Sequence, residues 1–68
     1  MNKKMLKSKM VLFDDNQNRL AAKLNMTIAT LSHKLSGKRD WKLSEIKKIA
    51  EIYELNAQEI WDIFIKED

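Results

Sequence analysis

Hydrophobic residues recur along this chain at spacings of three and four, the period of an amphipathic helix, in five successive segments. The second and third segments cover about residues 17–24 and 28–36, and only "NMT" separates them. Two helices joined so tightly cannot lie antiparallel, so the pattern predicts that they cross at a steep angle.

The residue types in this pair suit such a crossing. Each segment carries two leucines one turn apart on its buried stripe, which are Leu20, Leu24, Leu31 and Leu35. Met26 is placed to fill the angle between the helices, and Ala21 is small where they approach most closely. The arrangement is that of a helix-turn-helix, in which two helices at about 90–120° are joined by a turn of about 3–4 residues.

The first and fourth segments follow the same rule. We expect a first helix over about residues 3–13, with Leu6, Met10 and Phe13 on its buried stripe. A fourth helix follows the loop "KRDWK", and its apolar positions are Ile46, Ile49, Ala50 and Tyr53.

Short polar residues mark the ends of several helices. Asn16 and Thr27 are candidate N-caps of the second and third helices. Gly37, the only glycine, follows the third helix at the position where a left-handed residue closes a helix. The fifth helix opens with a capping box formed by Asn56 and Glu59.

Composition limits the fold class. With 68 residues the chain has room for one domain, residues 1–68. It has no proline and one glycine, whereas strands linked by tight turns would require more of both. We therefore predict an all-α fold, a compact five-helix bundle with the helix-turn-helix at its second and third helices. The chain has no cysteine and no apolar run near the ~20 residues that span a bilayer, which indicates a soluble cytoplasmic protein.

Charge is distributed unevenly along the chain. Residues 1–42 carry ten Lys/Arg against three Asp, a balance of +7, and residues 43–68 carry three Lys against seven acids, a balance of −4. A solvated surface without a charged partner usually mixes its signs. The asymmetry therefore predicts a basic face for a polyanion.

The chain resembles the lambda-repressor/Cro superfamily of Xre-type regulators, in particular its small phage and prophage members. The resemblance covers Gln17 to Gly37 and extends more loosely over the rest, particularly "LSGKRDWKLSEIKKIAEIY". The agreement includes the opening glutamine and the small Ala21. The chain departs from the pattern at Asn25, which replaces the usual glycine of the turn and tolerates left-handed conformations. It departs again at Lys42, where a threonine often caps the fourth helix.

The resemblance implies that the third helix enters the major groove of double-stranded DNA and turns four side chains toward base edges, which are Ile28, Ala29, Ser32 and His33. Helical geometry also places the last three opposite the inward leucines, and small residues there let the helix sit deep in a groove about 12 Å wide. His33 suits guanine N7 or O6, while Ile28 and Ala29 suit thymine methyl groups. Ile28 also extends the leucine stripe, so a core position is an alternative for it.

Phosphate contacts are expected at both ends of this helix pair. Asn16 and Gln17 open the second helix, whose N-terminus presents free amide groups. The other candidates flank the third helix and are Thr27, Thr30, Ser36, Lys38 and Arg39, with Lys34 a weaker one. The reading face has no Arg, Gln or Asn, so shape and phosphate contacts should carry much of the affinity.

The fifth helix is expected to expose apolar groups. If it buries Ile60 and Phe64, with Ile63 as a further candidate, other apolar residues remain outside. Exposed apolar clusters often mark interfaces, and members of the resembling family commonly act as dimers, so Trp61 and Ile65 are a possible dimer contact. The alternative is that the last residues fold back on the first helix.

Together these observations predict a DNA-binding regulator of transcription, a Cro-like repressor of a phage, prophage or mobile element that occupies a palindromic operator as a possible homodimer. One histidine, no cysteine and no glycine-rich phosphate loop argue against an enzyme. We expect no metal, cofactor, small-molecule ligand or membrane. Trp41 is interpreted as a core anchor rather than a base-stacking residue. An antirepressor-like protein-interaction module, or the DNA-binding antitoxin of a toxin pair, remains an alternative function.

Overall fold

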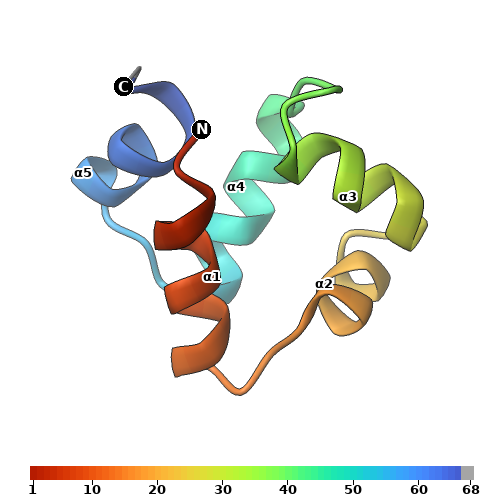
Figure 1. The fold of residues 1–68 in the computed structure, drawn as a ribbon. Coiled ribbons are helices and arrows are strands. Elements are labelled where there is room, and N and C mark those ends of the chain that lie inside the picture. The colour runs from red at the N-terminus through yellow and green to blue at the C-terminus, as the bar shows by residue number, and fades with distance from the viewer. Residues whose placement is uncertain (67–68) are drawn as a thin grey trace.

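Helices make up all the regular structure in residues 1–66, the part of the chain that the computed structural model describes. The elements are α1 (Lys3–Leu12), α2 (Gln17–Lys23), α3 (Ile28–Leu35), α4 (Leu43–Ile52) and α5 (Ala57–Ile60), which continues into a π-helical turn, η1 (Trp61–Ile65). The predicted all-α five-helix fold is confirmed for these residues. Figure 1 shows α4 between α1 and α5 on one side and α2 and α3 on the other. None of the helices described is long and apolar enough to cross a membrane.

One hydrophobic core joins α1, α2, α3, α4 and η1. Its buried side chains are Leu6, Met10, Leu20, Ala21, Leu24, Leu31, Leu35, Ile49, Tyr53 and Ile63. The predicted leucine stripes of α2 and α3 are therefore confirmed. Met26 and Trp41 pack against the edge of this core, as expected for both.

The predicted helix ends are also confirmed. Asn16 and Thr27 cap α2 and α3 through their side-chain oxygens. Asn56 and Glu59 form the capping box of α5, with reciprocal bonds of 2.8 and 3.0 Å. Gly37 has φ +86°, the left-handed conformation expected after α3.

The end of α1 corrects one prediction. Asp14 adopts φ 53°, which ends the helix. Phe13 then caps α1 with 37% of its surface exposed, and its ring packs edge-on against Tyr53 with centroids 5.5 Å apart. The prediction that Phe13 belongs to the buried stripe was wrong, because a residue after the last helical turn no longer follows the helical period.

The last helix also differs from its predicted pattern. Ile63 is the fully buried residue, while Ile60 and Phe64 are only partly buried. The segment ends in a π-helical turn, closed by a 2.8 Å bond from Lys66 N to Trp61 O, which the sequence did not predict. The amide of Asn2 donates to Ile63 O at 2.7 Å, which joins the start of the chain to η1.

Candidate nucleic-acid interface

The turn between α2 and α3 has the geometry that the sequence predicted. Figure 1 shows the two helices crossing rather than running side by side. Asn25 has φ 55°, so it fills the left-handed position of the missing glycine. Bonds from Met26 N to Ala21 O at 3.0 Å and from Asn25 N to Ala22 O at 3.1 Å close the turn. Ala21 is 2% exposed, so a larger side chain there would push the helices apart.

The outer face of α3 is open to solvent. Leu31 and Leu35 are buried on its inner side. The four predicted base-reading residues, Ile28, Ala29, Ser32 and His33, are all exposed on α3. Ile28 has half of its surface exposed, so it is not a core residue. Contact of these side chains with bases stays a prediction.

Some polar groups at the start of α2 already form hydrogen bonds within the protein. Asn16 Oδ1 accepts from Arg19 N at 2.9 Å, and Asn16 N donates to Asp15 Oδ1 at 2.9 Å. These bonds leave the side-chain NH₂ of Asn16 as the donor that a phosphate can meet. Gln17, the other candidate here, is partly buried.

The hydroxyl groups around α3 are also engaged. Thr27 Oγ1 donates to Thr30 Oγ1 at 3.0 Å, and Ser36 Oγ donates to His33 O at 3.1 Å. Thr30 Oγ1 accepts the first of these bonds, so its own hydroxyl hydrogen can donate to a phosphate without a change in the rest of the structure. Thr27 and Ser36 must rotate their hydroxyl groups before they can donate to a phosphate.

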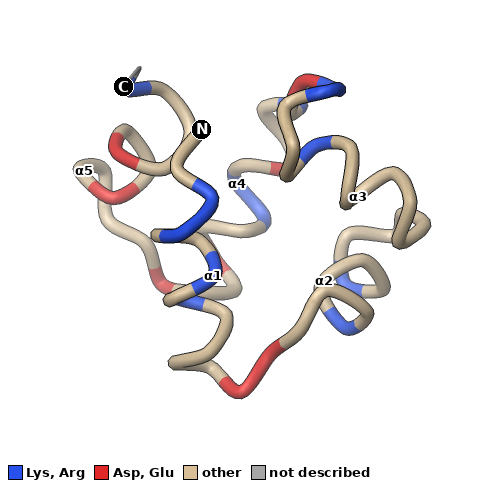
Figure 2. Tube along the Cα trace, viewed as in Figure 1, with Lys and Arg blue, Asp and Glu red and all other residues tan. Residues whose placement is uncertain are grey.

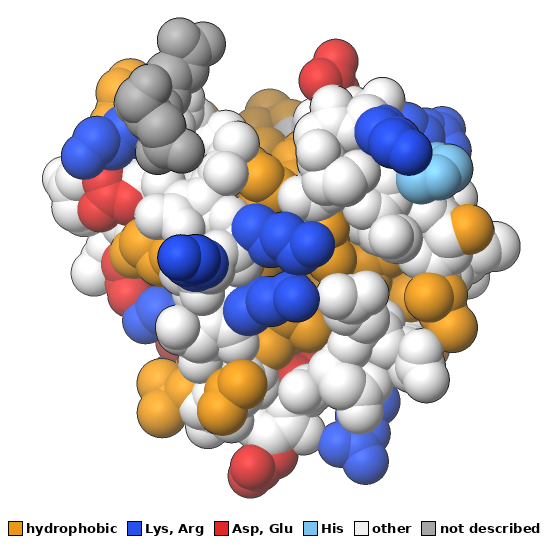
Figure 3. All heavy atoms as spheres, viewed as in Figure 1, with side chains coloured by type: hydrophobic (Ala, Val, Ile, Leu, Met, Phe, Trp, Pro, Cys, Tyr) orange, Lys and Arg blue, Asp and Glu red, His pale blue; other side chains and the backbone are white. Residues whose placement is uncertain are grey.

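Lys38 and Arg39 follow α3 on a backbone that folds back onto its last turn. Their amides both donate to His33 O, at 2.9 and 3.2 Å. The left-handed Gly37 makes this reversal possible. Both side chains are exposed, and Figure 3 shows Lys and Arg side chains gathered near this loop.

Lys34 does not lie where a phosphate contact requires it. Its side chain is 4% exposed and forms an ion pair with Glu45 of α4. Its ammonium also lies 6.0 Å from the centroid of the Trp41 ring. The interpretation of Lys34 as a weaker phosphate candidate was therefore wrong, because its charge is turned into the protein.

Some basic residues of the first 42 positions are engaged within the protein. In the part of the chain that the structure describes, three of them pair with acids, which are Lys9 with Glu59, Lys23 with Asp15, and Lys34 with Glu45. Figure 2 shows that the basic residues of α1 lie apart from α3. Near the trailing end of α3, Lys38 and Arg39 therefore supply the exposed positive charge.

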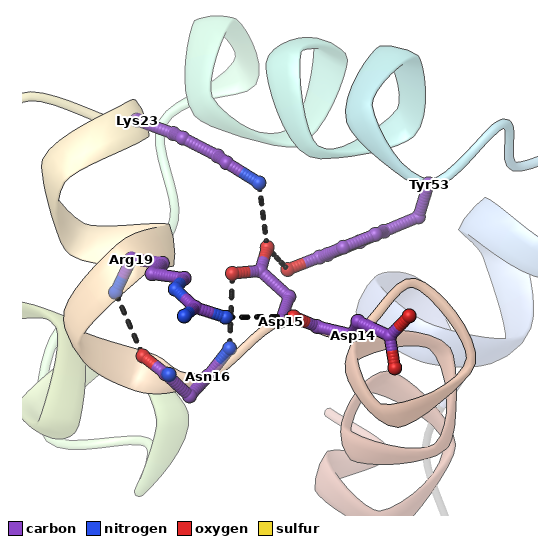
Figure 4. A network of polar contacts seen from close by, with 6 residues as sticks. All are labelled: Asp14, Asp15, Asn16, Arg19, Lys23 and Tyr53. Atoms are coloured by element: carbon purple, nitrogen blue, oxygen red, sulfur yellow. Dashed lines mark hydrogen bonds and ion pairs between the residues drawn. The ribbon is translucent and has the colours of Figure 1, made fainter.

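Asp15, which the sequence analysis did not select, connects three parts of the fold (Figure 4). Its Oδ2 accepts from the Tyr53 hydroxyl at 2.6 Å and from Lys23 Nζ at 3.0 Å, and its Oδ1 accepts from Asn16 N. The Asp15 side chain is fully covered. This carboxylate therefore ties the start of α2 and the end of α4 to the end of α1.

The surroundings of Asp15 and Tyr53 shift the pKa values of both groups. Burial favours a higher pKa for Asp15, but the bonds from Tyr53, Lys23 and Asn16 hold the pKa below its ordinary value. Burial and the adjacent carboxylate raise the pKa of Tyr53 well above its ordinary value. A buried tyrosine usually finds a partner for its hydroxyl, and this need was the available signal that an acid would lie nearby.

The predicted dimer contact is exposed. Trp61 and Ile65 each have 51% of their surface exposed on η1. The alternative expectation was that the last residues fold back on the first helix; within the described residues η1 does pack against α1, while residues 67–68 lie outside the described part of the chain. Folding back on α1 thus leaves Trp61 and Ile65 accessible.

Comparison with known proteins gives a match to a family model. The family described as "Protein of unknown function (DUF739)" matches residues 3–67. No curated protein and no solved structure matches the chain.

Proposed function

Because this chain belongs to the DUF739 family of proteins of unknown function, its role must be argued from its own surface, and we propose that it is a sequence-specific regulator of transcription that binds double-stranded DNA. In this proposal α3 enters the major groove. The resemblance to lambda-repressor/Cro proteins supports the same reading.

The open face of α3 carries the proposal. Its exposed residues include the small Ala29 and Ser32, which allow the helix backbone to approach base edges closely. Ile28 keeps half of its surface in water at the leading end, where thymine methyl groups are apolar partners of suitable size. His33 adds one hydrogen-bonding group to this face.

Few polar side chains of α3 can contact bases, so in this proposal contacts with the phosphate backbone of the DNA supply much of the affinity. Lys38 and Arg39 extend from the loop after α3, and Arg19 lies in the first turn of α2, where its Nη1 also donates to Asp14 O at 2.9 Å. The Asn16 amide group and the Thr30 hydroxyl are further, neutral donors. Such contacts set the register of a protein on the duplex, and base contacts then select the sequence.

The mode of action that fits best is occupancy of an operator, as in a Cro-like repressor of a phage, prophage or mobile element, without catalysis. Exposed Trp61 and Ile65 offer an apolar surface for a second copy. A two-fold dimer would read a palindromic operator with half-sites about 10–10.5 base pairs apart.

Selection of bound duplexes from a random pool tests this proposal. We expect enrichment of one motif, and a palindrome if two copies bind. Weak retention of random duplex at low salt should accompany it, and should decline steeply as salt is raised. If the folded protein retains no duplex even at low salt, the proposal is wrong.

The exposed apolar pair on η1 also favours a second candidate, a protein-interaction module such as an antirepressor or an antitoxin. In that case Trp61 and Ile65 would bind a different protein rather than a second copy. Stable co-purification with a toxin would identify an antitoxin, and failure to bind duplex would favour the antirepressor.

A further inference from the structure

The loop formed by residues 36–42 is tied at both ends to one carboxylate. Glu45 Oε1 accepts from Lys42 N, the last residue of the loop, at 2.8 Å. The same oxygen pairs with Nζ of Lys34, two residues before the loop begins. Lys42 cannot complete a capping box, because an ammonium group has no acceptor. The carboxylate therefore connects the end of α3 to the start of α4.

The connection is covered. The Lys34 side chain is 4% exposed and that of Glu45 is 16% exposed. Trp41 shields the ammonium from the loop side, and its ring packs edge-on against Phe64 with centroids 5.4 Å apart. Burial favours a higher pKa for Glu45, but the bonds from Lys34 and the Lys42 amide hold the pKa below its ordinary value. The Glu45 carboxylate is thus charged at neutral pH.

A buried ion pair of this kind is a weak source of net stability, because desolvation of two charges offsets much of their attraction. The pair does fix how its two side chains lie, since each charge must face the other. Because Lys34 is in the last turn of α3 and Glu45 in the first turn of α4, the pair holds these two turns at a fixed distance. The loop that carries Lys38 and Arg39 spans this distance.

We propose that Lys34 and Glu45 are positioning residues for DNA binding, which hold residues 36–42 so that Lys38 and Arg39 meet phosphates. This inference rests on the proposed function. Neither Lys34 nor Glu45 touches DNA in it, because both are covered by the protein.

The variant Glu45→Ala distinguishes a positioning role from a long-range effect of charge, because the two predict opposite changes in DNA affinity. Glu45→Ala removes a negative charge near a polyanion, so long-range attraction alone would tighten binding. The positioning role instead gives weaker binding and a flatter salt dependence, by up to about 1.8 in the slope of log K against log salt for two lost phosphate contacts. Glu51→Ala removes the same charge from an exposed position of α4 and is the matched control. Equal affinity of the two variants would overturn the proposal.

Glu45→Ala leaves the Lys34 ammonium buried without a partner, so a second variant keeps the test independent of folding. Lys34→Met/Glu45→Leu removes both charges, conserves net charge and fills the space with apolar atoms, an exchange that proteins often tolerate. We expect the double variant to melt cooperatively, as a folded protein does. We nevertheless expect it to bind duplex more weakly than the wild-type protein, with a flatter salt dependence. Wild-type affinity and slope in this folded variant would refute positioning.

Hydrogen exchange in the free protein separates this inference from the proposed function. The amides of Lys38 and Arg39 bond to His33 O, and we expect both to exchange faster in the double variant. Unchanged exchange would disprove the positioning role even if wild-type protein binds DNA. Faster exchange with no DNA binding by the wild-type protein would instead defeat the proposed function.

Discussion

The Tyr53 hydroxyl at the end of α4 donates to Oδ2 of Asp15 at 2.6 Å, across a gap of 38 positions in the sequence. The same carboxylate accepts from Lys23 at the end of α2. One side chain thus holds the helix-turn-helix against the rest of the core. Its removal should affect the whole fold rather than one loop.

We expect Asp15→Asn to lower the free energy of unfolding by about 1–3 kcal/mol, because it replaces charge-assisted bonds to a buried partner. The stability of the native chain should also depend on this group through pH. The pKa of Asp15 is lower in the folded chain than its ordinary value of 3.8, so the unfolded chain binds the proton more tightly. The contribution is therefore complete above about pH 4 and is lost as pH falls through the folded pKa.

Urea unfolding at about pH 7 and about pH 3 measures both effects. Asp15→Asn should lose part of the acid sensitivity, and the remainder should come from Glu45 and Glu59, whose pKa values are also lowered. Asp14→Asn, at the exposed neighbouring position, is the control and should keep the wild-type pH dependence. Identical pH profiles for all three proteins would contradict the assigned role of Asp15.

Replacement of Lys38 and Arg39 by Ala should weaken binding to every duplex. The slope of log K against log salt should flatten by up to about 1.8, because each neutralised phosphate contributes about 0.9. Lys3→Ala/Lys4→Ala removes the same charge from α1, apart from α3, and should change the slope less. Fluorescence anisotropy across a salt series makes the comparison, and equal slopes for the two double variants would exclude the loop as a contact.

His33→Ala should change sequence preference rather than general affinity. Loss of one hydrogen bond to a base should lower the ratio of specific to random binding by about fivefold, or about 1 kcal/mol. The selected site and a scrambled duplex, titrated at one salt concentration, report this ratio. A proportional loss on both duplexes would assign His33 to the backbone instead.

Trp61→Ala/Ile65→Ala should lower self-association and cooperative binding to a palindromic site, because it removes exposed apolar surface from η1. Sedimentation equilibrium, with and without duplex, measures the effect. Leu43→Ala, at an α4 position that is 82% exposed, is the matched control. If both variants associate as the wild-type protein does, the η1 surface is not the dimer contact.

Local signals in the sequence were sufficient for the helix pair and its ends. Asn16 and Thr27 cap their helices, and Asn25 and Gly37 take left-handed conformations. Each of these features depends on residues within one turn of the chain. The outer face of α3 followed from the same logic, because burial of its leucines determines which side chains are exposed.

Features that depend on distant partners were not predictable in this way. Lys34 was read as a surface charge because Glu45, its partner, is eleven positions away on another helix. Asp15 was missed for the same reason, since Tyr53 lies far along the chain. Ile63 was a candidate for burial, but the π-helical turn that carries it was not predicted. The exposed basic charge is likewise smaller than the sequence suggested, because Lys9, Lys23 and Lys34 pair with acids in the described residues.

The bond between Asn2 N and Ile63 O has a practical consequence for handling the protein. It brings the first residues beside η1, and Figure 1 places the start of α1 and the end of η1 on the side away from α3. A fluorescent label or an affinity tag attached at either end would therefore leave the outer face of α3 unobstructed. A short peptide that joins the start of α1 to the end of η1 would make a cyclic variant, or a permuted one with new ends in a chosen loop, because these two segments lie side by side.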